Sequence, residues 1–425
     1  MKRVQSSRRE FLHTAVAAGT AATLAAGSYA RVLGANDRIG VGVIGCGVRG
    51  RYIVQNMIPP ADANLQIVAV NDIWKHRMAT YPDQVKQQTG DLPRTFADYR
   101  DLLDQADVDA VIIATPAHQH CGQLSDAAAA GKHAYVEKPI APLMESLEEL
   151  NGCYDAVQKS GIVVQHGTQG VSGPQGPALR DFLAAGPLGK LFRIESSVSL
   201  VRPYWTFYTD GPKSAGETDW TQFLYGKPDR PFDADMHAAW MGYYDFSSGP
   251  MCGWMSHFSN FVHAVTGSGC PKSATAWGGS YVPGRDPRRT APDNVSVVLE
   301  YGEGFYTQFE SHFGSNYDTE STRFMLEKGM VETRFGHDPG NPVYSSKGVS
   351  DEVPEQKLLE EDPPYPGAAH VRDWADAIRS GTQPVSNMDM GYRQGVAVAM
   401  ADTSYRLQRK VVFDETTREI KPAQA

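Results

Sequence analysis

Three glycines, Gly45, Gly47 and Gly50, stand in a G-x-G-x-x-G spacing directly after the apolar run from Ile39 to Ile44. The pattern predicts a buried strand that turns sharply into a helix. Gly45 permits the tight turn, Gly47 lets the backbone approach a pyrophosphate, and Gly50 allows the helix to pack closely on the strand. The anion then lies at the helix N-terminus. The residues expected to contact a dinucleotide here are Gly45, Gly47, Val48, Arg49 and Gly50.

An acidic residue in the right place strengthens this hypothesis. A second apolar run, Leu65 to Val70, ends in Asn71 and Asp72, about 20 residues after Gly50, where a ribose-binding carboxylate belongs in a dinucleotide fold. Asp72 favours NAD because a carboxylate repels the 2′-phosphate of NADP. Arg77 lies nearby in the sequence and leaves NADP open.

Two further strand ends carry polar residues that the fold must bring to the same edge. The run 109–114 ends in Thr115, and the run 133–136 ends in Glu137 and Lys138. Ligands of open α/β sheets gather beyond the carboxyl ends of the strands. The alternation of these strands with helices at about 121–130 and 143–160 predicts a doubly wound parallel Rossmann sheet over residues 37–166.

The pattern changes after residue 167. Long strand-like runs at 191–201, 274–282, 295–301, 305–312 and 324–335, with hairpin signals between them, predict an open, mostly antiparallel sheet. Residues 336–367 read as a loop or arm, helices return at 370–380 and 388–409, and a strand follows at 411–413. We therefore predict an α/β protein whose second domain, residues 167–415, is of the α+β class.

The composition excludes several classes of protein. The net charge of −9 gives no electrostatic reason to expect nucleic acid as a partner. The five cysteines form no close C-x-x-C pair, so we predict neither a disulfide framework nor a metal site. An open sheet face favours a homodimer or tetramer.

The N-terminal residues have the pattern of an export signal. Ser7-Arg8-Arg9-Glu10-Phe11-Leu12 precedes a mild apolar segment and small residues near Ala30, and this resembles a twin-arginine signal over residues 1–30. The apolar segment is shorter than the ~20 residues that span a bilayer, so a membrane anchor is not expected. The resemblance implies periplasmic localisation after export of a folded protein, which would need to hold its nicotinamide cofactor tightly and recycle it.

An ordered set of motifs then follows the glycine turn. Thr115-Pro116-Ala117-His118-Gln119-His120, Ala130-Gly131-Lys132-His133, Glu137-Lys138-Pro139 and Gln165-His166-Gly167-Thr168-Gln169 resemble the Gfo/Idh/MocA family of oxidoreductases, and the likeness covers nearly the whole chain after the leader. The resemblance implies that Lys138 lies beside the nicotinamide ribose and the reacting hydroxyl. It also implies that Thr115, His120 and Glu137 line the cofactor.

Physical chemistry agrees with such a role for Lys138. Alcohol oxidation needs a base for the hydroxyl proton and a cation that stabilises the developing alkoxide, and a buried lysine can titrate near neutrality. The alternative is a surface lysine that pairs with Glu137.

The sequence departs from the family at the second acid–base motif. The family pattern D-x-G-x-H-x-x-D corresponds here to the segment from Gly253 to Asn260, in which only His257 remains. Three interpretations follow: His257 acts alone or with a carboxylate such as Asp219 or Asp245, the substrate itself supplies the missing group, or ordinary dehydrogenation is weak. The structural alternative is a core histidine. Asn260 retains the ability to bond a sugar hydroxyl.

The substrate pocket is predicted from aromatic and polar residues. Arg202 and Trp205 follow a strand, Gln169 belongs to the family match, and Asn260 ends the His257 motif. Aromatic faces stack on sugar rings, although aromatic residues at this density also form cores.

Three hypotheses remain for the function. The first is a NAD(P)-dependent oxidoreductase that acts on a sugar, sugar alcohol or glycoside, with Lys138 and His257 as catalytic residues. The second is a glycoside-cleaving enzyme that oxidises the sugar transiently, eliminates the leaving group and returns the hydride. The third is a sugar-binding protein whose chemistry has decayed.

Overall fold

The computed structural model describes residues 37–316, 319–335 and 340–424. Residues 40–425 cluster into one compact unit, and the following description concerns that unit. The predicted twin-arginine signal at residues 1–30 lies outside the described residues. No helix among the described residues is both long enough and apolar enough to cross a bilayer.

The first half is the expected parallel sheet. Its strands follow the order β3-β2-β1-β4-β5-β6, and the pairs β2–β3, β1–β4, β4–β5 and β5–β6 are parallel. The strands are β1 (Ile39–Ile44), β2 (Leu65–Asn71), β3 (Arg94–Phe96), β4 (Ala110–Ile113), β5 (His133–Glu137) and β6 (Val164–Gly167). β1 and β4 are buried throughout because helices cover both faces of such a sheet, and this explains their continuous apolar runs.

Helices connect these strands. They are α2 (Val48–Tyr52), η1 (Ile53–Met57), α3 (Ile58–Ala61), α4 (Lys75–Thr89), α5 (Tyr99–Leu103), η2 (Ala117–Gln119), α6 (His120–Ala129), η3 (Met144–Ser146) and α7 (Leu147–Ser160). Right-handed crossovers on the two sides of β1 and β4 run in opposite directions, so the loops after these strands meet at a topological switch point. The first candidate site belongs there.

The second half is built on a ten-stranded sheet in the order β14-β13-β12-β11-β7-β10-β9-β8-β15-β16. Among the described strands of this second sheet, only β7 and β10 pair in parallel, so the sheet is mostly antiparallel, as predicted. Its strands are β7 (Leu191–Leu200), β8 (Ser273–Gly279), β9 (Asn294–Glu300), β10 (Tyr306–Phe313), β11 (Thr319–Leu326), β12 (Gly329–Arg334), β13 (Val343–Ser345), β14 (Gln356–Lys357), β15 (Val411–Asp414) and β16 (Glu419–Pro422).

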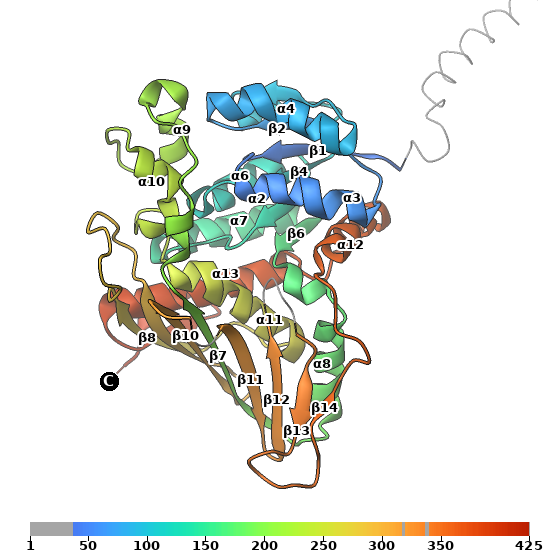
Figure 1. The fold of residues 1–425 in the computed structure, drawn as a ribbon, viewed down its shortest axis with the longest axis vertical. Coiled ribbons are helices and arrows are strands. Elements are labelled where there is room, and N and C mark those ends of the chain that lie inside the picture. Colours follow the sequence, from blue (N-terminus) through green and yellow to red (C-terminus); the bar gives the residue numbers. More distant parts are fainter. Residues whose placement is uncertain (1–36, 317–318, 336–339, 425) are drawn as a thin grey trace, which may run out of the picture. The chain divides into compact units, whose positions relative to one another are not determined.

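Two long helices, α11 (Ser256–Thr266) and α13 (Met388–Leu407), lie between this sheet and the parallel sheet (Figure 1). α13 is buried along most of its length, since it packs on β8 and also on α7 of the first half. Three further helices of this half are η4 (Gln169–Ser172), α8 (Gln175–Ala185) and α12 (Gly367–Ser380). The long central helix therefore ties the two halves into one body.

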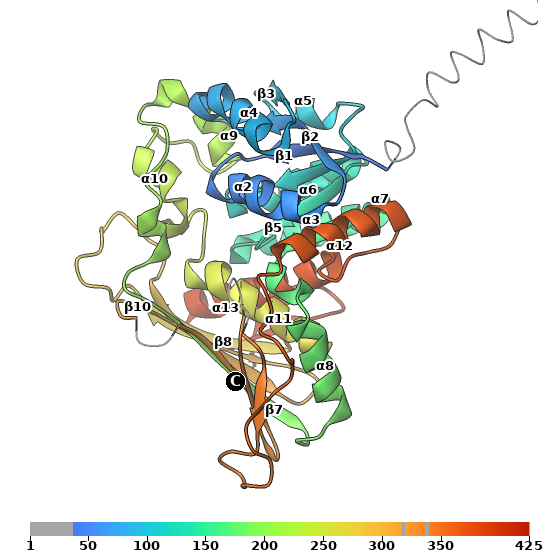
Figure 2. The same ribbon diagram turned by 45° about the vertical axis from the view of Figure 1, so that its right-hand side comes forward.

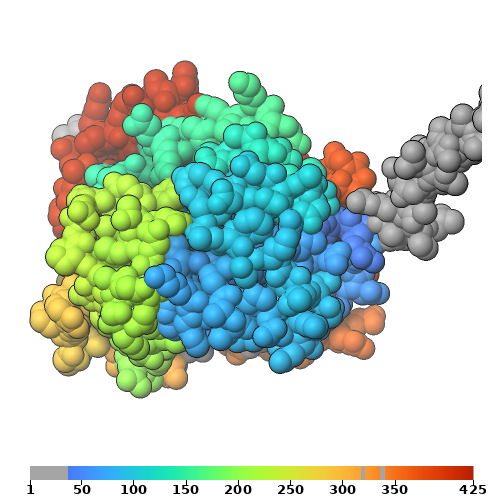
Figure 3. All heavy atoms as spheres, turned by 90° about the horizontal axis from the view of Figure 1, so that it is seen from above, coloured from blue at the N-terminus to red at the C-terminus, as the bar shows by residue number. Residues whose placement is uncertain are grey.

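A segment between β7 and α11 departs from the layered pattern. Residues 201–250, here called the strap, contain only short helices: η5 (Tyr204–Phe207), η6 (Ala215–Glu217), α9 (Trp220–Leu224), α10 (Ala234–Ala238) and η7 (Trp240–Gly242). The strap leaves the large sheet and reaches the parallel sheet, where α9 lies near α4 in two views (Figures 1 and 2). In the space-filling view its surface abuts that of the first half (Figure 3).

Candidate active site

The glycine turn has the geometry that a dinucleotide requires. Gly45 has φ +90°, and a Cβ there would lie 2.8 Å from the backbone of Ala114. A Cβ at Gly50 would lie 2.1 Å from the Gly45 carbonyl oxygen. These two positions need glycine for the turn and for helix packing. Gly47 is different, because a Cβ there would meet no atom closer than the Arg77 Nη1 at 3.7 Å, so its open side faces the cavity described below.

Asp72 locks this turn to the next strand end. One carboxylate oxygen accepts from the Cys46 backbone N–H at 2.9 Å, and the other accepts from the Trp74 N–H at 2.8 Å. Arg77 lies 3.4 Å from the same carboxylate, and its guanidinium stacks 4.8 Å from the centre of the Trp74 ring. The acid predicted to bind ribose thus lies at the turn, at the wall of the cavity.

Lys138 follows β5 and reaches across to the second half. Its Nζ donates to the Gly253 carbonyl oxygen at 2.8 Å. That carbonyl belongs to η8 (Met251–Met255), a π-helical turn that leads into α11. Turns of this kind occur frequently at functional sites. Burial lowers the pKa of Lys138 below its usual range, although the neighbouring Glu137 and Cys252 oppose this shift.

Glu137 is the centre of a buried polar network. Its Oε1 accepts from Arg49 Nε at 2.7 Å, from the Tyr135 hydroxyl at 3.2 Å and from the Gln169 amide at 3.3 Å. Burial alone would raise the pKa of Glu137, but the charge and hydrogen bond of Arg49 outweigh it, so the pKa lies below its usual value. An ionised carboxylate is therefore held beside Lys138.

His120 joins two strand ends. Its Nδ1 lies 2.7 Å from the Pro139 carbonyl oxygen, and its Nε2 lies 2.9 Å from that of Thr115. Burial lowers its pKa, although both carbonyl contacts oppose this. The Thr115 hydroxyl donates to Gln123 at 2.6 Å. Both residues line the cavity, and they position the loops after β4 and β5.

His257 lies in the first turn of α11 and shares the cavity wall with Lys138. The place of the family carboxylate is filled, because a Cβ at Gly253 would lie 2.0 Å from the Tyr204 hydroxyl oxygen. The two carboxylates suggested as substitutes lie elsewhere. Asp219 caps α9 by accepting from the Gln222 N–H, and Asp245 pairs with Arg230 at 3.1 Å. Neither of them lines the cavity.

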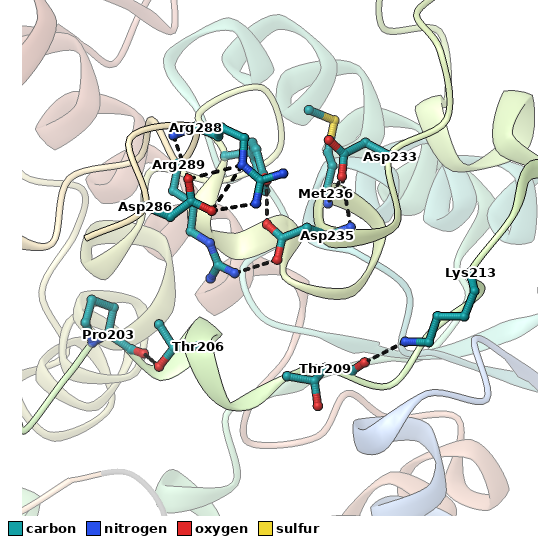
Figure 4. Close-up of polar contacts among 11 residues, drawn as sticks. Pro203, Thr206, Thr209, Lys213, Asp233, Asp235, Met236, Asp286, Arg288 and Arg289 are labelled. Carbon is teal, nitrogen blue, oxygen red and sulfur yellow. Dashed lines mark hydrogen bonds and ion pairs between the residues drawn. The ribbon is translucent and has the colours of Figure 1, made fainter. Parts of the chain in front are cut away.

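The strap is bound to the first half by polar contacts. Lys75 Nζ donates to the Gly216 carbonyl oxygen at 2.7 Å, and the Asp219 N–H donates to that of Ile73 at 3.1 Å. His118 and Gln119 donate to the Phe223 carbonyl oxygen at 2.8 and 2.9 Å. On its other side the strap is held by Arg289, which pairs with Asp235 at 2.7 Å (Figure 4).

A cavity of about 1150 Å³ runs beneath the strap. One part of its wall is the glycine turn and the strand ends, with Gly45, Gly47, Val48, Arg49, Asp72, Thr115, His120, Glu137 and Lys138. The other part comes from the second half, with Phe207, Tyr208, Thr209, Asp210, His237, Trp240, Met241, His257 and Tyr365. The first part suits a dinucleotide and the second leaves room for a substrate.

The residues present fit a dinucleotide. The open side of Gly47 faces the cavity, and Arg49 Nη2 is buried without a hydrogen-bond partner among the described residues. A buried guanidinium nitrogen of this kind is satisfied by an anion or a hydroxyl. The described residues contain no group of three or more His, Cys, Asp or Glu that could hold a metal ion.

The predicted substrate residues are placed differently. Trp205 is 1% exposed and packs on Tyr204 and Phe313, Asn260 donates to Thr168, and Gln169 belongs to the Glu137 network. None of these three lines the cavity, so they support its walls from behind. Arg202 is exposed and stacks 5.4 Å from the Phe207 ring. Gly50 is buried behind the turn.

Sequence reasoning missed several residues of the cavity. Phe207, Tyr208, Asp210 and Met241 come from the strap, and Tyr365 comes from the segment predicted to be an arm. The available signal is the aromatic run Tyr204-Trp205-Thr206-Phe207-Tyr208 at a strand end. Within this run Trp205 is buried, whereas Phe207 and Tyr208 are exposed, and residue type alone does not distinguish them.

Comparisons with known proteins agree with this geometry. A family model described as an oxidoreductase family with an NAD-binding Rossmann fold matches residues 39–168, and the GFO/IDH/MocA C-terminal domain model matches residues 177–332. Together they span most of the chain.

Curated relatives match a shorter part. An uncharacterized oxidoreductase, YrbE, of Bacillus subtilis is 33% identical over 156 residues, 36% of this chain and 42% of the relative. A glycosyl hydrolase family 109 protein of Shewanella sp. (strain ANA-3) is 34% identical over 134 residues, 31% of this chain and 29% of the relative. The scyllo-inositol 2-dehydrogenase (NAD(+)) of Bacillus subtilis is 30% identical over 148 residues, 35% of this chain and 41% of the relative. The matches thus span less than half of the length of each of these relatives.

Solved structures extend the likeness in fold to both halves. The aldose-aldose oxidoreductase from Caulobacter crescentus, in complex with glycerol, aligns with a TM-score of 0.66 at 18% identity, covering 88% of this chain and 100% of that one. Levoglucosan dehydrogenase with NADH and levoglucosan aligns with a TM-score of 0.65 at 17% identity, covering 88% and 99%. With both domain models matched in order and the fold shared over both halves, the chain belongs to the Gfo/Idh/MocA family of oxidoreductases.

Proposed function

We propose that this protein is a NAD-dependent oxidoreductase that acts on a sugar, sugar alcohol or glycoside and keeps its cofactor bound between turnovers. The observation that carries the proposal is that Lys138 and His257, which come from different halves, line the same cavity as the glycine turn. The substrate class is supported by the names of similar proteins, which act on scyllo-inositol, aldoses and levoglucosan.

NAD, when bound, accepts or returns a hydride at its nicotinamide ring. The chain must then handle the hydroxyl proton of the substrate. Lys138 suits this task, because burial lowers its pKa and makes the neutral amine available as a base at lower pH. Once protonated, the same group is an ammonium that stabilises negative charge on the substrate oxygen. The Gly253 carbonyl fixes its Nζ by a hydrogen bond.

His257 is the second group of the proposed site. It is 5% exposed and stands at the start of α11, on the wall shared with Lys138. We assign to it the transfer of a proton between the substrate and water in the cavity. Glu137 is adjacent to Lys138 in sequence and its lowered pKa keeps it ionised, so it supplies a fixed negative charge beside Lys138, and the acid–base work falls to Lys138 and His257.

Retention of the cofactor is proposed from the strap. Contacts such as Lys75 to Gly216 and His118 to Phe223 attach the strap to the first half, and we expect release of a dinucleotide to be slowed by the need to open them. Opening of a covering segment is a conformational step that limits release in many enzymes. Such retention also suits the export that residues 1–30 suggest, since the periplasm offers no pool of free NAD. Fractionation of cells that express the full chain tests export directly.

Substitution of Lys138 by Met tests the proposal. Methionine keeps much of the volume but removes the titrating amine, so we expect turnover to fall by about 10²- to 10⁴-fold. Binding of dinucleotide, measured by titration calorimetry, should change little because the glycine turn is intact. Lys132→Met, in the loop that precedes β5 and outside the cavity, is the control. Wild-type turnover in Lys138→Met would overturn the mechanism.

A second candidate function is glycoside cleavage through transient oxidation, favoured by the similarity to glycosyl hydrolase family 109 proteins. Oxidation of a ring hydroxyl to a ketone makes the neighbouring C–H acidic. Removal of that proton expels the leaving group, water adds at the anomeric carbon, and the hydride returns to the ketone. The net reaction is hydrolysis, and it needs no pair of carboxylates flanking the bond.

One experiment separates the two candidates. Dialysed protein is incubated with aryl glycosides, without added NAD, while aglycone and nicotinamide absorbance are followed. Release of aglycone over many turnovers supports glycoside cleavage, whereas a change in nicotinamide absorbance with intact substrate supports net redox chemistry. Tight sugar binding without either signal, across a broad panel, would contradict both.

A further inference from the structure

A small second hollow adjoins the ribose end of the main cavity. It has a volume of about 50 Å³ and is lined by Cys46, Arg51, Trp74, His76, Arg77, Thr80, Tyr81, Gln84 and Asp210. Three of these residues contact Asp72: Cys46 and Trp74 through their backbone N–H groups and Arg77 through its guanidinium. The hollow therefore lies directly beside Asp72, the proposed ribose-binding carboxylate.

Two guanidinium groups face this hollow. Arg51 Nη2 and Arg77 Nη2 each lie 4.0 Å from one carboxylate oxygen of Asp210. Arg77 Nε is buried and has no hydrogen-bond partner among the described residues. Two arginines, one of them with an unsatisfied buried nitrogen, form the kind of site that binds a phosphate through several N–H donors.

Asp210 is supplied by the strap and not by the parallel sheet. It lines both the main cavity and the hollow. It lies in a turn that Lys213 closes by donating to the Thr209 carbonyl oxygen at 3.3 Å (Figure 4). Its side chain is 61% exposed, and its two ion pairs are long. The carboxylate is thus held near the arginines without filling all of their hydrogen-bonding capacity.

We propose that Asp210 selects NAD against NADP, because its carboxylate occupies the position between Arg51 and Arg77 that the 2′-phosphate of NADP would otherwise take. This inference rests on the proposed function, since it concerns the same dinucleotide. Asp72 repels the phosphate from the strand end, and Asp210 repels it from the strap. The segment that covers the cofactor also decides which cofactor enters.

The effect has a definite sign and size. A charge pair 4 Å apart in water changes an equilibrium constant by about fivefold, and the exposure of Asp210 keeps the effect near this aqueous limit. Asp210→Asn removes the repulsion and releases Arg51 Nη2 and Arg77 Nη2 from the Asp210 charge, so that both can donate to the phosphate. We therefore expect the Kd for NADP to fall by about five- to tenfold, and the Kd for NAD to change by less than about twofold.

The test is titration calorimetry of the full chain, stripped of nucleotide by charcoal, with NAD and NADP in turn. Asp229→Asn removes the same charge from an exposed position of the strap outside the hollow and should leave the NAD-to-NADP ratio unchanged. Adding Arg51→Gln to Asp210→Asn should reverse part of the gain in NADP affinity.

The outcomes distinguish this inference from the proposed function. If the wild-type chain binds NAD but Asp210→Asn leaves the ratio of the two Kd values unchanged, the inference is wrong and the proposed function stands. A wild-type preference for NADP would also overturn it. If the wild-type chain binds neither dinucleotide, the proposed function fails and the inference fails with it.

Discussion

At the scale of single residues, the electrostatics of the site centre on the neighbours Glu137 and Lys138. Burial lowers the pKa of Lys138, while the ionised Glu137 and Cys252 raise it and Arg49 lowers it. Burial lowers the pKa of His120 and of His166, to about 3 for His166, and the positive charge of Lys138 lowers both pKa values further. Glu137 is the nearest negative charge in sequence, so its charge is the one to vary.

Glu137→Gln should move the acidic limb of the kcat/KM profile to lower pH. The active form of Lys138 is the neutral amine, and the negative charge of Glu137 favours the ammonium. Without that charge the proton leaves Lys138 at a lower pH, so activity appears earlier as the pH rises. The amide oxygen of Gln can still accept from Arg49, which limits structural damage. Glu148→Gln on the exposed face of α7 is the control.

The direction in which the acidic limb moves tests whether Lys138 is the base. A limb that stays in place, or one that moves to higher pH in Glu137→Gln, would contradict the assignment of Lys138 as the base.

At the scale of elements, the π-helical turn η8 presents a backbone carbonyl oxygen to Lys138 at the position where the family motif has a carboxylate side chain. Gly253 offers its carbonyl oxygen to Lys138, and the space beside its Cα is taken by the hydroxyl of Tyr204, whose ring packs on Trp205 and Phe313. The family carboxylate could not be accommodated here without moving the strap. The absence of that acid is therefore coupled to the presence of the strap.

Gly253→Ala should destabilise the fold by about 1–3 kcal/mol, because its Cβ would overlap a hydroxyl that is held in a packed aromatic cluster. Thermal unfolding followed by circular dichroism measures this change. Gly152→Ala in α7 is the matched control, since a Cβ there meets nothing within 4 Å and should be neutral or stabilising. Adding Tyr204→Phe should return part of the loss. Equal unfolding temperatures for Gly253→Ala and the wild type would refute this account of η8.

Regular elements were predictable from the sequence, and irregular ones were not. β1 and β7 begin where their apolar runs begin, and the fold class is confirmed because both sheets have strong periodic signals. β3 has only three residues and β14 only two, so neither leaves a pattern. The strap has no periodicity at all, because its position depends on contacts with loops far away in the sequence.

The same division applies to the site. The glycine turn, Asp72, Lys138 and His257 all line the cavity, since motif spacing reports on the ends of regular strands and helices. Trp205 and Phe207 cannot be ranked by residue type, because only the folded strap shows that one is 1% and the other 57% exposed. Their roles toward substrate remain predictions, as do the domain boundaries at 37–166 and 167–415.

At the scale of the whole molecule, the large sheet presents one face away from α11 and α13. On β8, Ala274 and Ala276 are buried, whereas Thr275 and Trp277 are exposed, Trp277 by 60%. An open sheet face of this kind favours association with a second copy of the chain, and Trp277 would lie within the contact. We therefore propose a homodimer or a tetramer that forms through this face.

Trp277→Lys should shift the protein toward smaller species in sedimentation velocity, because a charge would be buried at the interface. Leu92→Lys changes another exposed apolar residue, 62% exposed and on the first half, and is the control. A sedimentation coefficient unaffected by Trp277→Lys would place the interface elsewhere or indicate a monomer.

The strap also bears on how this protein can be engineered. Its residues follow β7 in the chain, yet they form hydrogen bonds with Ile73, Lys75, His118 and Gln119. These four residues lie in the segments that follow β2 and β4 of the parallel sheet. A chimera that takes one half from a relative would separate each donor from its acceptor. Domain exchange therefore succeeds only when residues 201–250 travel together with the sheet loops that they cover.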